Sequence, residues 1–223
     1  MINAMVYAAG LGTRMGELTK DRPKPMIDVA GRPLLDHAMS AIDVPQVSKV
    51  ILNTHYKRDA IEGHDFSRPV SISYEETLLE TGGGLKNALP MITSETVLTA
   101  NSDSVWRGPN PAGVLLEHWE SDMDALLLLI PKMRAIGHKG TGDFDRTRDG
   151  LLRRGSAYVY SGLQLIKTAH FAEVEDTIFS TNVIWDHLLA SDRLSGVVYP
   201  GQWCDVGYPE AIPLAELMLA DEA

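Results

Sequence analysis

Short apolar runs alternate with amphipathic stretches over the first 130 residues of the chain. The apolar runs are rich in Val and Ile and have the length of buried strands, whereas the stretches between them have helical spacing. We expect strands at 4–9, 49–53, 70–74, 96–100 and 124–130, and helices at 33–42, 56–63, 84–89 and 111–119. Strands that alternate with helices are typical of a parallel sheet. The first half therefore predicts a Rossmann-like, open, mostly parallel α/β sheet with helices on both faces.

The pattern changes after residue 140, where strands follow one another directly. Strands are expected at 142–146, 151–153 and 157–166, and Asp149-Gly150 is a hairpin turn signal between the first two. Helices are expected again at 179–189 and 210–219. The second half therefore predicts a small β-rich portion that is attached to the parallel sheet.

Composition indicates a single cytoplasmic domain. A chain of 223 residues with 44% hydrophobic residues can bury one sizeable core. Its single cysteine, Cys204, is incompatible with a disulfide framework and suits a reducing compartment. A secretory signal carries positive charge before its apolar run, whereas the first basic residue of this chain, Arg14, comes after the run. No apolar run has the length of a membrane span. A net charge of −10 argues against nonspecific nucleic-acid binding.

The segment 5–25, MVYAAGLGTRMGELTKDRPKP, is the most informative part of the sequence. The first expected strand ends in a loop with Gly10 and Gly12, and glycines let backbone N–H groups approach an anion closely. Arg14 and Lys24 add a guanidinium fork and a point charge. Basic residues outnumber acidic ones between 14 and 25, so this segment is a positive island on an acidic protein. It predicts a nucleoside triphosphate site at the end of a strand.

Two other nucleotide-binding loops fit this segment less well. The dinucleotide fingerprint G-x-G-x-x-G requires a third glycine where this chain has Met15, and Gly16 comes one residue too late. A P-loop ends in Gly-Lys-Ser or Gly-Lys-Thr, which does not occur in the sequence. A dehydrogenase and a P-loop NTPase are therefore both disfavoured.

The loop and five later blocks together resemble the sugar-1-phosphate nucleotidyltransferase family. The loop has G-x-G-T-R-M followed by P-K-P, and the later blocks are L-E-T-G-G-G at 79–84, N-S-D at 101–103, G-D-F at 142–144, Y-S-G at 160–162 and W-C-D-V-G at 203–207. The resemblance covers nearly the whole chain and implies a glycosyltransferase-A-like fold in one domain, 1–223. It assigns the nucleotide to residues 1–130, the sugar to 131–200, and a metal-ligand turn and helix to 201–223.

The resemblance also implies the residues that bind and activate the nucleotide. Arg14 and Lys24 would contact the reacting phosphates, and Asp103 and Asp205 would share one Mg²⁺. Residues at 80–84 would form a loop before a helix, with backbone groups of Gly82 and Gly83 facing the base. The full implied nucleotide set is Tyr7, Ala9, Gly10, Gly12, Thr13, Glu80, Gly82, Gly83 and Asp103.

Four positions depart from the family pattern, and the two aspartates have structural alternatives. Ser102 replaces a glycine, Gly16 and Glu17 replace an arginine and a proline, and Tyr7 replaces a leucine. From position alone, Asp103 could be a turn residue and Asp205 a helix cap. Both alternatives stay open at the level of sequence.

The sugar site is expected around the later blocks. The implied residues are Gly142, Asp143, Ser161, Gly162, Thr181 and Asn182, although the last two could also be helix caps. Cations close in sequence could recognise a carboxylate on the sugar: Lys132, Lys139, Arg134, Arg146 and Arg148. The seven histidines have no metal-ligand spacing and are interpreted as surface or core residues.

The resemblance implies transfer of a nucleotidyl group from a nucleoside triphosphate to a sugar 1-phosphate. The short length and the L-E-T-G-G-G block favour UTP and N-acetylmuramate 1-phosphate, and hence a role in cell-wall recycling. A mannose-1-phosphate guanylyltransferase is the alternative within this chemistry. A noncatalytic nucleotide-sugar-binding regulator is the alternative outside it. Neither a nucleic-acid partner nor a membrane is expected, and the oligomeric state is left open.

Overall fold

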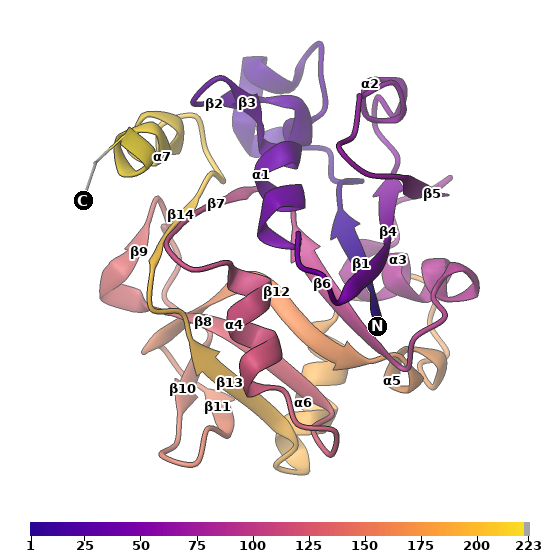
Figure 1. Cartoon of the computed structure of the whole chain (residues 1–223), viewed down its shortest axis with the longest axis vertical. Helices are drawn as coiled ribbons and strands as arrows, with labels where there is room; N and C mark the ends of the chain where they lie inside the picture. Colours follow the sequence, from indigo (N-terminus) through magenta and orange to yellow (C-terminus); the bar gives the residue numbers. More distant parts are fainter. Residues whose placement is uncertain (221–223) are drawn as a thin grey trace.

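A twisted central sheet forms the middle of the molecule in the computed structural model, which describes residues 1–220 (Figure 1). Within these residues nine strands belong to the sheet, with the order β11-β10-β12-β6-β1-β4-β5; β8 pairs with β12, and β13 pairs with β8. Their bounds are β1 Ile2–Tyr7, β4 Val47–Thr54, β5 Val70–Tyr74, β6 Thr96–Asn101, β8 Ala125–Pro131, β10 Phe144–Arg146, β11 Leu152–Arg154, β12 Tyr158–Lys167 and β13 Leu194–Val198.

The sheet is mostly parallel on the side of the N-terminal half, as the strand and helix alternation predicted. β1 pairs in parallel with β4 on one side and with β6 on the other, and β4 pairs in parallel with β5. Antiparallel pairing begins at β12, which joins β6, β8 and β10. The expected hairpin is present, because β10 and β11 pair antiparallel around Gly150, and it extends the central sheet.

Helices cover both faces of the sheet, which confirms the predicted fold class. Side chains of α1, α2 and α4 belong to one buried cluster, and those of α3, α5 and α6 belong to a second cluster on the opposite face. Figure 1 shows α1 and α4 in front of the sheet. The helix bounds are α1 Leu34–Ala41, α2 Asp59–Glu62, α3 Glu80–Ala88, α4 Pro111–His118, α5 Ala169–Ala172, α6 Asn182–Ala190 and α7 Ala211–Ala220.

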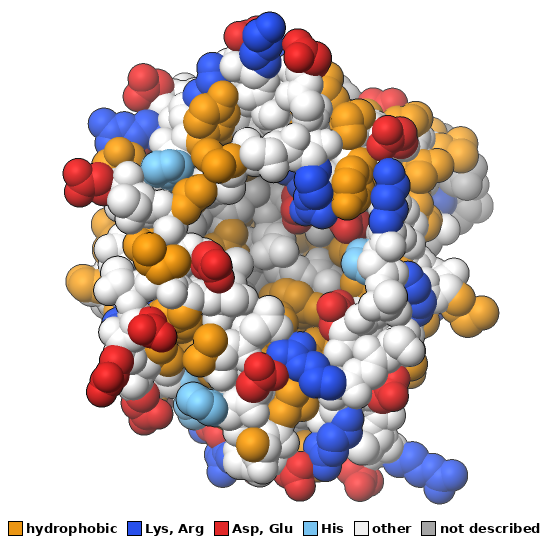
Figure 2. Space-filling view, turned by 180° about the vertical axis from the view of Figure 1, so that it is seen from behind, with side chains coloured by type: hydrophobic (Ala, Val, Ile, Leu, Met, Phe, Trp, Pro, Cys, Tyr) orange, Lys and Arg blue, Asp and Glu red, His pale blue; other side chains and the backbone are white. Residues whose placement is uncertain are grey.

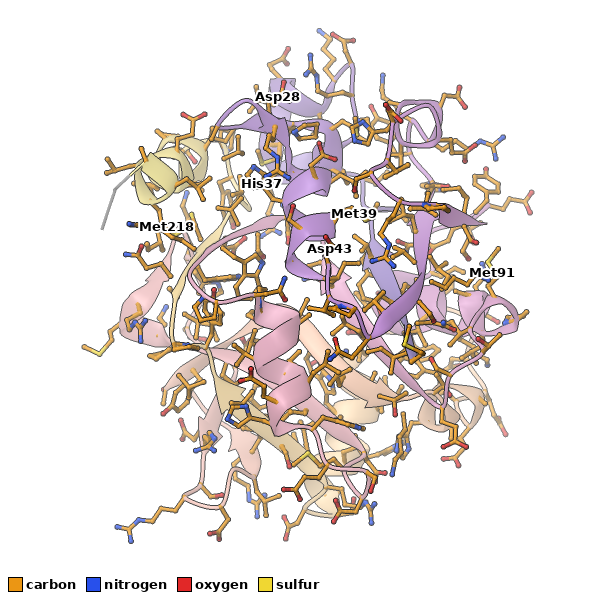
Figure 3. All side chains as sticks on the ribbon, viewed as in Figure 1. Asp28, His37, Met39, Asp43, Met91 and Met218 are labelled. Carbon is orange, nitrogen blue, oxygen red and sulfur yellow. The ribbon has the colours of Figure 1, made fainter. Side chains whose placement is uncertain are left out.

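A small second sheet, which the sequence did not indicate, lies beside the central one. It has the order β7-β14-β9, with β7 at Ser104–Arg107, β9 at Ala135–Ile136 and β14 at Gln202–Asp205. Helix α7 packs on this small sheet through a third buried cluster, which includes Met218 (Figure 3). Met39 on α1 belongs instead to the cluster that α1 shares with α2 and α4. A two-stranded ribbon, β2 Asp28–Val29 with β3 Arg32–Pro33, precedes α1.

Three predicted elements differ from the structure. The stretch 56–63 is helical only over the single turn of α2, because Lys57 has a positive φ of 50°. The segment at 80–84, predicted as a loop, is the first part of α3. Asp205, expected in the metal-ligand turn, lies at the end of β14.

The C-terminal portion at 201–223 is only partly described, since its last three residues lie outside the described range. None of the helices found between residues 1 and 220 combines the length and the apolar character that crossing a bilayer requires.

Candidate active site

The loop after β1 brings its glycines against the second basic cluster. Gly12 has a left-handed φ of 64°, and a Cβ at this position would lie 2.8 Å from Lys24 Cβ and 2.9 Å from Thr19 Cγ2. Only glycine allows this approach without displacing its neighbours. The loop thus places Lys24 beside the end of β1, as the spacing of the two basic clusters suggested.

Lys24 forms a close ion pair at the end of β6. Its Nζ lies 2.9 Å from Oδ2 of Asp103, and the two side chains are 11% and 27% exposed. Pro23 and Pro25 flank the lysine and restrict its backbone. The preceding Ser102 is buried, and its hydroxyl donates to the backbone oxygen of Tyr7 at 2.6 Å. The serine that replaces the family glycine therefore ties the ends of β1 and β6 together.

Asp205 reaches the same place through the small sheet. In the β7–β14 pair Asp205 lies opposite Ser104, and the N–H of Val206 donates to the backbone oxygen of Asp103 at 2.8 Å. Burial raises the pKa of the Asp205 carboxyl, and the negative charge of Asp103 raises it further, while His138 and Lys24 lower it. Two carboxylates that repel one another in a shared site are suited to a cation.

The oxygen donors at this point fit Mg²⁺ chemically. Mg²⁺ is commonly held by one or two carboxylates and completes its shell with water and substrate phosphates. Asp103 and Asp205 supply such a pair and line one cavity. No group of three or more His, Cys, Asp or Glu side chains that could hold a metal occurs within residues 1–220. The donor set therefore matches a metal that is bound together with phosphates.

Arg14 lies on the short 3₁₀ helix Thr13–Thr19, which follows the glycine loop. Its guanidinium is 5.1 Å from the centre of the Tyr208 ring. A hydrogen bond with Tyr208 raises the pKa of Arg14, and the charges of Asp103 and Asp205 add to this effect. Together with Gly10, Gly12, Thr13 and Lys24 it lines a shallow cavity that also contains Asp103. The two predicted phosphate-binding cations therefore share one cavity.

A first cavity of about 340 Å³ contains most of the predicted nucleotide residues. It includes the carboxyl ends of β1, β4 and β6, where ligands of open α/β sheets bind. The predicted residues that line it are Tyr7, Ala9, Gly10, Gly12, Lys24, Glu80 and Asp103. Asn53, Glu75 and Ser102 also line it, although they were not among the predicted residues. We name it the nucleotide cavity.

A second cavity of about 340 Å³ contains most of the predicted sugar residues. Its lining includes the predicted Asp143, Ser161, Gly162, Thr181 and Asn182, with the aromatic rings of Tyr160, Trp185 and Trp203. Figure 2 shows a deep hollow in this face of the molecule, with basic and acidic side chains at its rim. We name this second cavity the sugar cavity. Tyr7, Thr81, Asn101 and Asp103 line both cavities, so the two are adjacent.

Two predicted roles for glycines do not fit the geometry. The N–H groups of Gly82 and Gly83 both donate to the backbone oxygen of Phe179 at 2.9 Å, and neither residue lines the nucleotide cavity. These N–H groups are therefore used inside the protein and do not face a base. Gly142 does not line the sugar cavity either, because it lies in a turn against the backbone of Ser156.

The cations expected beside the sugar are directed elsewhere. Lys132 donates to the backbone oxygen of Gly140, and Lys139 stacks on Tyr208 at 4.1 Å. Arg134 and Arg146 bond backbone oxygens at 200–201 and 196. None of these four, nor Arg148, lines the sugar cavity. Their proximity in sequence was therefore misleading.

His138 was not recognised from sequence, where all histidines were interpreted as surface or core residues. It lines the sugar cavity, and its Nδ1 lies 3.3 Å from Oδ2 of Asp205. Its Nε2 is buried without a hydrogen-bond partner among the described residues. The only local signal is the preceding Gly137, where a Cβ would collide with the backbone oxygen of Asp205 on β14.

The chain is similar to known proteins along nearly its whole length. Residues 4–141 match the model of the MobA-like NTP transferase domain. The chain is 38% identical to the N-acetylmuramate alpha-1-phosphate uridylyltransferase of Caulobacter vibrioides, over 98% of this chain and 97% of that protein. It is 31% identical to the mannose-1-phosphate guanylyltransferase of Mycobacterium tuberculosis, over 94% of this chain and 62% of that protein.

A solved structure supports the fold. The inositol-1-phosphate CTP transferase from T. maritima superposes with a TM-score of 0.83 at 15% identity, over 98% of this chain and 95% of that one. At this identity the likeness concerns the fold alone. The family match and the two relatives above confirm the nucleotidyltransferase resemblance of the sequence blocks, and this chain belongs to the MobA-like NTP transferase family.

Proposed function

We propose that this protein joins UTP to N-acetylmuramate 1-phosphate and releases pyrophosphate. The observation that carries the proposal is that the two cavities meet at Asp103. Asp205 lines the sugar cavity with it, and Lys24 Nζ lies 2.9 Å from the Asp103 carboxylate. A triphosphate in one cavity and a sugar 1-phosphate in the other would bring two anions together at this point. The choice of substrates follows the Caulobacter relative, which aligns along nearly its whole length.

The proposed reaction is an in-line attack of the sugar-phosphate oxygen on the α-phosphorus of the nucleotide. Both reactants are anionic, so catalysis depends on positioning and on compensation of charge. Arg14 and Lys24 would bind the phosphates of the nucleotide and stabilise the departing pyrophosphate. Mg²⁺, held by Asp103 and Asp205, would supply further neutralisation of phosphate charge when bound. Because these groups are fixed by the fold, little reorganisation would be needed.

The sugar cavity would orient the second reactant. Asp143 Oδ2 accepts the N–H of Tyr160 at 2.8 Å, which fixes this carboxylate in the wall, where its remaining lone pairs can accept from sugar hydroxyls or an acetamido N–H. Trp185 packs edge-on against Tyr160, with 4.8 Å between the ring centres. Its indole N–H donates to Gln164 Oε1 at 2.9 Å. These contacts make a rigid, partly aromatic wall of the kind that binds sugar faces. We place the reaction in the cytoplasm, where nucleoside triphosphates are made.

The test is a panel of substrates with pyrophosphate release as the signal. UTP, GTP, CTP and ATP are each combined with N-acetylmuramate, N-acetylglucosamine, glucose and mannose 1-phosphates in the presence of Mg²⁺. We expect the highest kcat/KM for UTP with N-acetylmuramate 1-phosphate. A higher value for GTP with mannose 1-phosphate would replace the substrates and keep the reaction. No release with any pair, while nucleotide still binds, would indicate a noncatalytic nucleotide-binding protein.

A further inference from the structure

The nucleotide cavity contains a buried carboxylate that the proposed mechanism does not use. Glu75 directly follows β5, is 2% exposed and lines the cavity. Within residues 1–220 it has no salt-bridge partner, although burying an unpaired carboxylate is costly. Its position at the carboxyl end of a strand is where this class of sheet binds ligands.

The hydrogen bonds of Glu75 leave acceptor capacity free. Oε1 accepts from Asn53 Nδ2 at 2.7 Å, and Oε2 accepts from the N–H of Leu79 at 3.1 Å. An ionised carboxylate has about four lone-pair sites. About two sites therefore remain for a ligand in the cavity.

Asn53 is held in one orientation beside this carboxylate. Its Oδ1 accepts the N–H of Ala8 at 2.7 Å, so its amide nitrogen must face Glu75. One amide N–H is used on Glu75, and the second is available because Asn53 also lines the cavity. The pair thus offers an acceptor and a donor side by side.

Helix α3 is shaped to fit this pair. A Cβ on Gly84 would lie 2.6 Å from Glu75 Oε1 and 3.1 Å from Asn53 Nδ2. The third glycine of the triple glycine block therefore makes room for the carboxylate. This explains one residue of a block whose other two glycines were wrongly expected to face the base.

We infer that Glu75, oriented by Asn53, reads the base by accepting a ring N–H. Uracil carries such an N–H next to a carbonyl acceptor, and guanine has the same arrangement on its pyrimidine edge. Cytosine and adenine present a bare ring nitrogen beside an amino group, which would set acceptor against acceptor and donor against donor. The pair therefore selects uracil and guanine over cytosine and adenine. This inference rests on the proposed function, because it assigns the base to the nucleotide cavity.

Glu75→Gln is the direct test, with Glu76→Gln as the matched control. Glu76 is the next residue and is exposed, so it undergoes the same chemical change outside the cavity. Dissociation constants of UMP and CMP, measured by calorimetry, need no turnover. We expect Glu75→Gln to reduce the preference for UMP over CMP by about 10- to 100-fold, the loss expected for one hydrogen bond to a charged group. Glu76→Gln should keep the wild-type preference.

A purely structural role for Glu75 gives a different result. Loss of its bonds to Asn53 and Leu79 would lower the melting temperature and weaken UMP and CMP equally. An unchanged ratio between the two nucleotides in a folded Glu75→Gln variant would overturn the inference.

The wild-type protein gives a second test that does not depend on the folding of the variant. UMP should bind at least about tenfold more tightly than CMP and than UMP methylated at the ring N–H. Equal affinities for the three ligands would overturn the inference. If the preference for UMP is found while no triphosphate gives pyrophosphate, the proposed reaction fails and the base-reading role stands.

Discussion

Lys24 Nζ lies 2.9 Å from Oδ2 of Asp103, a residue 79 positions further along the chain. The contact joins the glycine loop after β1 to the end of β6. It is possible because Gly12 has no side chain where Lys24 approaches. Asp103 lines both the nucleotide cavity and the sugar cavity, so the pair lies where the two cavities meet.

Replacing Lys24 should affect the chemical step more than binding. We expect Lys24→Ala to lower kcat by about 10²-fold with a smaller rise in the KM for triphosphate, because its charge is most useful where charge develops at the α-phosphate. Steady-state kinetics give both values. Lys20→Ala, an exposed lysine of the same segment, is the control. A rise in KM alone would show that Lys24 only holds the ground state.

A methyl group at Gly12 should displace Lys24. Gly12→Ala would force a left-handed φ of 64° on a residue with a Cβ and place that Cβ 2.8 Å from Lys24 Cβ. We expect kcat/KM to fall at least about tenfold and stability to fall by about 1–3 kcal/mol. Gly113→Ala on α4 meets its nearest atoms at 3.8 Å and should be tolerated. Wild-type activity in Gly12→Ala would contradict the tight contact.

The two carboxylates should act through one divalent cation. We expect Asp103→Asn and Asp205→Asn each to lower turnover by about 10²-fold or more, because two phosphates would then meet with less charge compensation. Both variants should also bind Mn²⁺ more weakly in the presence of UTP, as measured by electron paramagnetic resonance. Asp122→Asn, on an exposed turn, is the control. Near wild-type rates and Mn²⁺ affinity in Asp205→Asn would refute the assignment.

Part of this site could be predicted from sequence, and the reasons differ from residue to residue. The apolar run of β1 and the two glycines after it are local signals, so the loop and its cations were found. Asp103 follows a strand, but it was assigned to the metal through the family block at 101–103. Asp205 was identified through the family block, but its approach to Asp103 depends on the pairing of β14 with β7, which no local pattern encodes.

The errors arose where packing overrides local preference. Three consecutive glycines disfavour a helix, yet they lie within α3, which begins at Glu80. Glycine is required at these positions because Phe179, Thr177 and Glu75 leave no space for a Cβ. Glu75 was missed because an acidic residue after a strand is usually solvated, whereas the fold buries this one. His138 lies in a short loop whose position is set by β14, a contact 67 residues away.

Asp124 gives a prediction for stability at acid pH. The residue precedes β8, is 7% exposed and accepts from Arg193 and from Lys167 at 3.2 Å. Burial alone would raise the pKa of Asp124, but the bonds from Arg193 and Lys167 and the nearby His170 outweigh it and lower the pKa below its ordinary 3.8. A lowered pKa means that the stabilisation is present above pH 3.8 and is lost as pH falls through the folded value.

We therefore expect Asp124→Asn to destabilise the protein by about 1–3 kcal/mol near neutral pH. The difference from wild type should shrink as pH falls below about 4, where the unfolded-state carboxyl is protonated. Urea unfolding at a series of pH values measures both. A difference that stays constant down to the lowest pH would show that the carboxylate charge contributes nothing.

In the proposed reaction the α-phosphoryl group of UTP is transferred with its nucleoside to the sugar phosphate. Wild-type protein with Mg²⁺ and N-acetylmuramate 1-phosphate is given UTP labelled with ³²P either at the α- or at the γ-phosphate. We expect the α-label in the nucleotide sugar and the γ-label in pyrophosphate, in equal amounts. Appearance of the γ-label in the sugar product or in free inorganic phosphate, with the α-label left in UDP, would contradict it.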